Sequence, residues 1–139
     1  MAKYFLVSCV SQKASKSLPL KELYTSPLFV KARNFVEKDG ANWFILSAKY
    51  DLASPTAIHP PYNETLNKMK AADRRAWASR VLAALNSVVR PGDEVVFLAG
   101  EKYREYLEGP LREMGISVSV PMKGLGIGQQ MSWLDREVA

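Results

Sequence analysis

Polar side chains follow short apolar runs of the sequence, at the point where each run ends. Ser8 and Ser47 come directly after two such runs, and Glu101 comes three residues after a third. Uninterrupted apolar runs of this kind are typical of strands covered on both faces. Because ligands of open α/β sheets bind outside the carboxyl ends of the strands, we expect these side chains to converge on one cleft. The residues predicted to meet there are Ser8, Cys9, Ser11, Lys13, Ser47, Lys49, Tyr50, Gly100 and Glu101, together with Gln129 and the rest of the loop over residues 124–130, which follows the fourth strand.

Glu101, Lys13 and Lys49 are the candidate catalytic residues. A fixed carboxylate after a buried strand could act as a base or orient a water molecule. The alternative is that Glu101 only favours the start of a helix through the helix dipole. Lys13 and Lys49 follow neighbouring strands, if the first two strands pair, and could contact phosphate or stabilise a leaving group.

Three tyrosines near the predicted cleft could stack on a nucleobase. Tyr50 and Tyr62 lie in a long irregular stretch after the second apolar run, and Tyr24 lies in an earlier cationic segment. Loops of this length in compact domains are usually functional or disordered, and this one is too rich in aromatic and apolar residues for disorder. We therefore predict that it forms one wall of a binding site, while each tyrosine could instead belong to the core.

A glycine-spaced loop precedes the last predicted helix. Its spacing, Gly124, Gly126 and Gly128, departs from the dinucleotide-binding pattern and lacks the lysine of a P-loop. Backbone amides at a helix start, here Gly126 and Gly128, could still receive an anion or a carbonyl oxygen. Gln129 and Gln130 could present donors and acceptors to the edge of a base. The alternative is a tight turn with capping glutamines.

A dedicated metal site is not expected, because the chain has one histidine, His59, and one cysteine, Cys9. Cys9 could be a nucleophile, although cysteines at strand ends are most often small buried residues. His59 could act as a general acid or be a packed loop residue. No cofactor is predicted. A single cysteine fits a reducing cytoplasm, and the apolar run near the amino terminus is too short for a membrane span.

Composition indicates one globular domain. The chain has 139 residues, of which 47% are apolar, and a formal net charge of +5. This length is sufficient for one buried core. The positive charge favours a polyanionic partner such as DNA, although basic enzymes without such a partner are also common.

The order of elements predicts an α/β fold, a three-layer sandwich with a mainly parallel four-stranded sheet. The strands expected are residues 4–7, 43–46, 95–98 and 116–120. A helix is expected over 27–38, with Ser26 as its N-cap and Pro27 as its first residue, and a second one over about 71–89. A helix near Tyr103, which Pro110 breaks or restarts, and a short terminal helix follow. Arg74, Arg75 and Arg80 would lie on the surface of the second helix, as a solvated face or as phosphate contacts.

Six sequence blocks together resemble a known family over nearly the whole chain. The blocks are LVSCVSQKAS, ELYTSPLF, ILSAKYDL, PPYNETL, FLAGEKYREYL and GLGIGQQMSWL, and the family is DUF6884. That family is similar to YaaA-type DNA-binding proteins and to a domain of archaeosine synthases. The resemblance implies a core like that of the uracil-DNA glycosylases and a role with nucleic acid or modified bases. Asp51 stands where the family pattern leads us to expect glycine.

The resemblance and the predicted cleft together suggest a DNA glycosylase. Such an enzyme would cleave the N-glycosidic bond of a modified or damaged base, for example 5-hydroxymethyluracil or uracil, after the base leaves the duplex. Two alternatives stay open: a nucleic-acid-binding module without chemistry, and a hydrolase or transferase that acts on free nucleosides.

Overall fold

Four parallel strands form the centre of the protein, whose computed structural model describes residues 1–8 and 13–139. The strands correspond to the four predicted strands: β1 (Lys3–Ser8), β3 (Asn42–Ser47), β6 (Glu94–Leu98) and β7 (Ser117–Ser119). β1 pairs in parallel with both β3 and β6, and β6 pairs in parallel with β7. β1 is therefore an inner strand, and the carboxyl ends of all four strands lie at one edge of the sheet.

A fifth strand corrects the predicted architecture. β4 (Asp51–Ala53) pairs antiparallel with β3, so the sheet is mixed and its strand order is β4-β3-β1-β6-β7. A second, two-stranded sheet joins β2 (Leu18–Pro19) to β5 (Ile58–His59). The α/β class is confirmed, but the prediction of a mainly parallel four-stranded sheet is wrong, because a short antiparallel hairpin follows β3.

The hairpin explains why Asp51 departs from the expected glycine without breaking the fold. Ser47 lies opposite Asp51, so three residues connect β3 to β4. Tight hairpins commonly need a residue with positive φ where the turn joins the second strand. Asp51 has φ 60° and is the one non-glycine residue with positive φ in the described chain. Aspartate tolerates this conformation better than most residues, and Arg80 holds its carboxylate through contacts of 2.9 and 3.3 Å.

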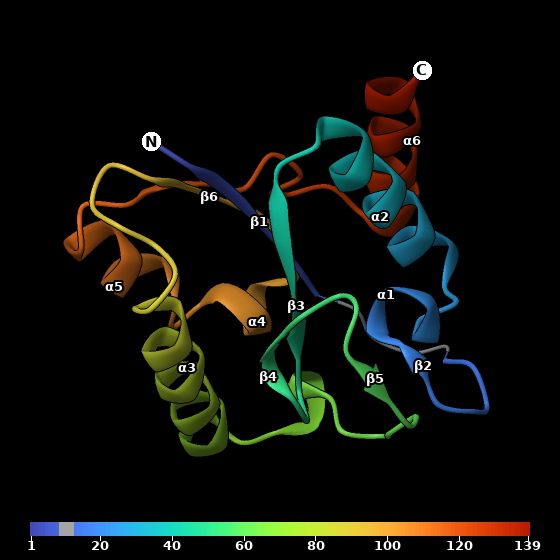
Figure 1. Cartoon of the computed structure of the whole chain (residues 1–139), viewed down its shortest axis with the longest axis horizontal. Coiled ribbons are helices and arrows are strands. Elements are labelled where there is room, and N and C mark those ends of the chain that lie inside the picture. The colour runs from blue at the N-terminus through green and yellow to red at the C-terminus, as the bar shows by residue number, and fades with distance from the viewer. Residues whose placement is uncertain (9–12) are drawn as a thin grey trace.

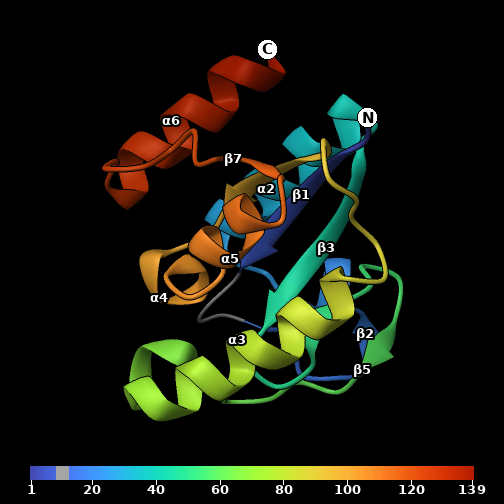
Figure 2. The ribbon, with the colours of Figure 1, turned by 90° about the vertical axis from the view of Figure 1, so that its left-hand side faces the viewer.

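Helices cover both faces of the sheet (Figure 1). α2 (Pro27–Asp39) and α6 (Ile127–Val138) pack against each other on one side. α3 (Ala71–Leu85), α4 (Glu101–Arg104) and α5 (Glu108–Glu113) lie on the other side, as Figure 2 shows. Two short elements, α1 (Leu20–Leu23) and the 3-10 helix η1 (Leu66–Lys68), complete the fold.

The helix ends follow from local sequence. Ser26 caps α2, where its Oγ accepts a hydrogen bond from the Phe29 amide at 3.3 Å, and Gly40 ends the helix with φ 80°. Pro110 lies inside α5, a separate helix from α4, which confirms the predicted interruption. The predicted second helix is confirmed, but it ends at Leu85 rather than near Val89.

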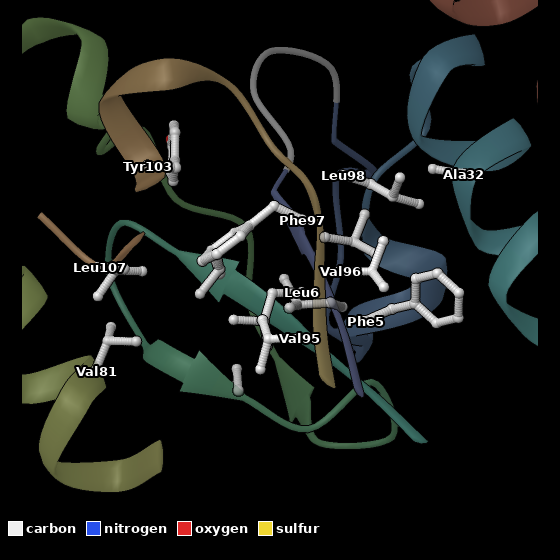
Figure 3. Packing of buried hydrophobic residues seen from close by; sticks show 14 of the residues in the cluster. Phe5, Leu6, Ala32, Val81, Val95, Val96, Phe97, Leu98, Tyr103 and Leu107 are labelled. Carbon is white, nitrogen blue, oxygen red and sulfur yellow. The ribbon is translucent and has the colours of Figure 1, made fainter. Parts of the chain in front are cut away.

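The core fills both sides of the sheet, because successive side chains of a strand point to opposite faces. In β6, Val95 and Phe97 point towards the side of Tyr103 and Leu107, whereas Val96 and Leu98 point towards Ala32 of α2 (Figure 3). All of these side chains are buried. In the described part of the chain, no helix is both long and apolar enough to cross a membrane.

Candidate functional site

A cavity of about 330 Å³ opens at the carboxyl ends of β1 and β6. Ser8 ends β1, and Leu98 ends β6. The starts of α2 and α6 form two further walls, and η1 and α4 close the remaining side. The lining residues are mostly apolar: Ser8, Ser26, Pro27, Leu28, Phe29, Ala32, Asn67, Leu98, Ala99, Gly100, Tyr103, Met122, Ile127, Gln130 and Met131.

Few polar groups face this larger cavity. The Ser8 hydroxyl accepts a hydrogen bond from the Gly100 amide at 3.3 Å. Gln130 donates from Nε2 to the Leu125 carbonyl at 2.9 Å, which leaves its side-chain oxygen as an acceptor. Asn67 is exposed and contributes an amide with both donor and acceptor groups. An apolar cavity of this size with a few polar groups is typical of small-molecule sites.

A smaller cavity of about 170 Å³ adjoins the larger one. The two share Ala99, Gly100, Met122 and Gln130. The smaller cavity is also lined by Glu101, Arg104 and Lys123, which do not line the larger one. Arg104 is held by Glu108 at 2.8 Å and by the Ala99 carbonyl at 3.2 Å, whereas Glu101 is exposed at the start of α4. The smaller cavity therefore places a carboxylate and two cations beside the larger, apolar one.

A hydrogen-bonded group of buried side chains, here termed the tyrosine network (Tyr24, Ser47 and Tyr62), lies at the carboxyl end of β3. The hydroxyls of Tyr24 and Tyr62 bond to each other, and Ser47 Oγ donates to Tyr62 at 3.0 Å. Ser47 Oγ also accepts from the amides of Lys49 and Tyr50, at 3.2 and 2.9 Å. Trp77 Nε1 donates to the Ser47 carbonyl at 2.8 Å, which ties the network to α3.

The two candidate lysines lie around this network rather than in the walls of either cavity. Lys13 Nζ lies 4.6 Å from the centre of the Tyr62 ring, and Lys49 Nζ lies 5.8 Å from the centre of the Tyr50 ring. Cations in such positions are attracted by the ring quadrupole. Lys49 is exposed, and Tyr50 is partly exposed.

The predicted site residues thus fall into separate groups. Ser8, Gly100 and Gln130 line the larger cavity, and Glu101 lines the smaller one with Gly100 and Gln130. Tyr24, Ser47 and Tyr62 form the tyrosine network. Cys9 and Ser11 lie outside the described residues.

The glycine loop has a capping role. Gln129 accepts at its side-chain oxygen from the Gly126 amide at 3.0 Å, which caps α6, while Gly128 lies inside that helix. This geometry favours the alternative of a turn with capping glutamines.

Two of the three arginines of α3 pair with acidic side chains. Arg74 Nε lies 2.6 Å from Glu105, and this hydrogen bond raises the pKa of the Arg74 guanidinium above its usual value. Arg80 pairs with Asp51. Arg75 lies over the Tyr106 ring at 5.0 Å. Because Arg74 and Arg80 already have acidic partners, they are weaker candidates for phosphate contacts than Lys49, which forms no ion pair within the described residues.

Several cavity residues were not predicted. Ser26 was predicted only as a helix cap, and Asn67, Tyr103, Met122 and Met131 come from segments far apart in sequence. The Tyr103 hydroxyl forms a hydrogen bond with the Thr65 hydroxyl and accepts another from the Leu66 amide, both at 3.4 Å. These bonds hold η1 against α4. Among residues 1–8 and 13–139, no group of three or more His, Cys, Asp or Glu side chains is placed to hold a metal ion.

Comparison with known proteins gives one match. A family model described as "Family of unknown function (DUF6884)" matches residues 4–136. No curated protein and no solved structure matches the chain. The similarity to YaaA-type proteins and to glycosylase-like domains therefore stays a prediction. Since the family model covers nearly the whole sequence, the chain belongs to the DUF6884 family.

Proposed function

We propose that the protein removes a modified or damaged base from DNA by hydrolysing its N-glycosidic bond. One observation carries this proposal: the larger, mostly apolar cavity at the carboxyl ends of β1 and β6 adjoins a smaller cavity that contains Glu101. Enzymes that act on a base within a duplex extrude it into a pocket, where stacking and a few hydrogen bonds hold it. The larger cavity suits the base, and the smaller one suits the sugar and phosphate.

The walls of the larger cavity support the binding of a planar ring. Phe29 and Tyr103 supply aromatic surface, and Leu28 and Met131 supply apolar surface. The Ser8 oxygen accepts a hydrogen bond from the Gly100 amide through one of its lone pairs. The Ser8 hydroxyl hydrogen can therefore be donated to a carbonyl group of the base. Asn67 could pair with a donor and an acceptor on the base edge, as amide side chains do elsewhere.

Glu101 is the proposed catalytic carboxylate. As the C1′–N bond breaks, its electron pair passes to the base and positive charge develops on the sugar. The carboxylate stabilises that charge and orients the water whose oxygen bonds to C1′, while the water proton is finally taken up by the base. In this arrangement Lys13 and Lys49, which lie around the tyrosine network, contact the strand rather than the leaving base.

A binding module without chemistry is the second candidate function. The exposure of Glu101 favours it, because a catalytic carboxylate is usually fixed and partly desolvated. A hydrolase or transferase of free nucleosides would use the same cavity, but it would have less need for the net positive charge of the chain, because its substrate carries no phosphate backbone.

The test is base release from oligonucleotides that carry 5-hydroxymethyluracil or uracil, followed by alkaline cleavage of the abasic product. We expect Glu101→Gln to slow release by about 10²-fold or more, since it keeps shape but removes the charge. Glu113→Gln is the matched control, because Glu113 is an exposed glutamate on α5 outside the walls of both cavities.

Three results would redirect the proposal. Equal rates for wild type and Glu101→Gln would assign the chemistry to another residue. DNA binding without release of any base would favour the binding module. Release from free nucleosides but not from oligonucleotides would favour the nucleoside enzyme.

A further inference from the structure

A partly exposed aromatic stack lies beside the tyrosine network, where the Tyr50 ring meets the Tyr62 ring with centres 5.4 Å apart. The rings of Tyr50 and His59 are stacked, with centres 3.8 Å apart and planes at 17°. The Tyr50 hydroxyl donates to the Pro60 carbonyl at 3.4 Å, which holds the ring in place. The neighbouring Ile58 is 67% exposed. We term Tyr50, Ile58 and His59 the aromatic shelf.

Lys49 lies beside the aromatic shelf, and Lys16 is close to it along the chain. Lys49 Nζ lies 5.8 Å from the centre of the Tyr50 ring. Lys16 is exposed and lies two residues before Leu18, which pairs opposite His59 in the small sheet. Within the described residues, neither lysine forms an ion pair. Their charge is therefore not compensated within this part of the protein, unlike that of Arg74 and Arg80.

The shelf and the larger cavity open at the same edge of the sheet. Ser8, which lines the cavity, pairs opposite Leu46, and the hairpin that carries Tyr50 begins one residue later at Ser47. Neighbouring strands lie about 4.8 Å apart. The sheet thus sets the aromatic shelf beside the cavity, one strand further along.

We propose that the aromatic shelf binds the DNA strand next to the nucleotide whose base enters the larger cavity. Unpaired strands are held by aromatic side chains that stack on bases and by cations that contact phosphates, and the shelf offers both. The choice of DNA as partner rests on the proposed function. This inference gives Tyr50 and Lys49 a role in holding the strand, separate from the base pocket and from catalysis.

The direct test measures binding of a labelled, unmodified single-stranded oligonucleotide by fluorescence anisotropy at low salt. We expect Tyr50→Leu to weaken binding about 10-fold, the scale on which loss of one stacking ring is measured. Tyr50→Phe keeps the ring and should bind like wild type. Tyr4→Leu is the matched control, because Tyr4 is also partly exposed, stacks on an aromatic ring and donates to a backbone carbonyl, but at the opposite end of β1.

A second measurement separates this inference from the proposed function. Affinity of the larger cavity for a free pyrimidine base should be the same in Tyr50→Leu and wild type, because the shelf lies outside that cavity. If wild type releases no base from any substrate, the proposed function fails. The anisotropy result still tests whether the aromatic shelf binds a DNA strand. Circular dichroism checks folding, and His59→Ala, with the same expected loss, replaces Tyr50→Leu if that variant is unfolded.

Three outcomes would overturn the inference. The first is that both Tyr50→Leu and His59→Ala bind the oligonucleotide as tightly as wild type does. The second is that Tyr4→Leu loses as much affinity as Tyr50→Leu. The third is that wild type does not bind the oligonucleotide at low salt.

Discussion

The larger cavity and the tyrosine network lie at the same edge of the sheet but differ in what their polar groups do. In the network, Ser47 is fully buried and its hydroxyl is bonded to Tyr62 and to two backbone amides. In the cavity, Ser8 accepts one amide hydrogen bond and lies beside unfilled space. Two serines that follow strands in the same way thus have different partners. Polar groups satisfied inside the protein mainly stabilise it, whereas those facing a cavity are available to a ligand.

This comparison predicts that substitutions around the network reduce stability, whereas substitutions at the cavity rim reduce binding. The largest effect is expected for Trp77→Ala. Trp77 is 1% exposed, and its indole donates to the Ser47 carbonyl. Its removal should lower the free energy of unfolding by about 3–5 kcal/mol. Urea unfolding measures this, and Trp77→Phe, which keeps most of the packing, should lose clearly less. Similar losses in both variants would mean that packing at Trp77 contributes little.

A smaller loss is expected within the network itself. Tyr62→Phe removes the hydroxyl that Ser47 and Tyr24 share, and should lower the free energy of unfolding by about 1–3 kcal/mol. Ser47→Ala should act through the same bonds. The double variant should therefore lose less than the sum of the single losses, with a coupling of about 0.5–3 kcal/mol. Strict additivity would show that the two hydroxyls act independently.

The hairpin turn should show a still smaller effect. Asp51→Gly loses the exposed ion pair with Arg80, worth about 0–1 kcal/mol, but relieves the positive φ. The two changes oppose each other, so the net change in unfolding free energy should stay within about 1 kcal/mol. Asp51→Ala loses the pair without that relief and should be the less stable variant. The order of the two thermal midpoints tests this, and the reverse order would contradict the role of the turn.

The smallest effect on stability is expected at the cavity rim. Ile127 is 66% exposed and lines the larger cavity. Ile127→Trp should change the free energy of unfolding by less than about 0.5 kcal/mol, as exposed substitutions usually do. It should nevertheless weaken binding of a free nucleobase, because the indole narrows the cavity. Glu113→Trp, at an exposed residue of α5 outside both cavities and outside the aromatic shelf, is the control for equilibrium dialysis. Unchanged binding in Ile127→Trp would argue against the cavity as the base site.

The sequence was sufficient to predict the strands and helices that carry the fold. Three apolar runs became the parallel strands β1, β3 and β6, because each is long enough and apolar enough to be largely buried. The fourth predicted strand became β7, which lies at the edge of the sheet and is only partly buried. Ser26 and Pro27 marked the start of α2 correctly. β4 was missed because it is only three residues long and its turn uses Asp51 where glycine is the usual signal.

The candidate site was less predictable than the fold. Strand ends indicate which edge of the sheet binds ligands, and Ser8 and Gly100 were found in this way. Sequence patterns cannot indicate whether a polar residue at that edge will be satisfied internally, as Ser47 is, or will face a cavity. Asn67 and Met131 reach the cavity only because η1 and α6 pack beside the same strand ends, which depends on tertiary packing.

The inner position of β1 also has a kinetic consequence. This strand is synthesised before both of its neighbours, yet Tyr4 pairs opposite Asn42 on one side and opposite Val95 on the other. Contacts between residues so far apart in sequence slow folding, because a long loop must close before they form. Until β6 emerges from the ribosome, one edge of this apolar strand has no partner and can pair with another chain. The nascent protein should therefore be most prone to aggregation before residue 98 has been released.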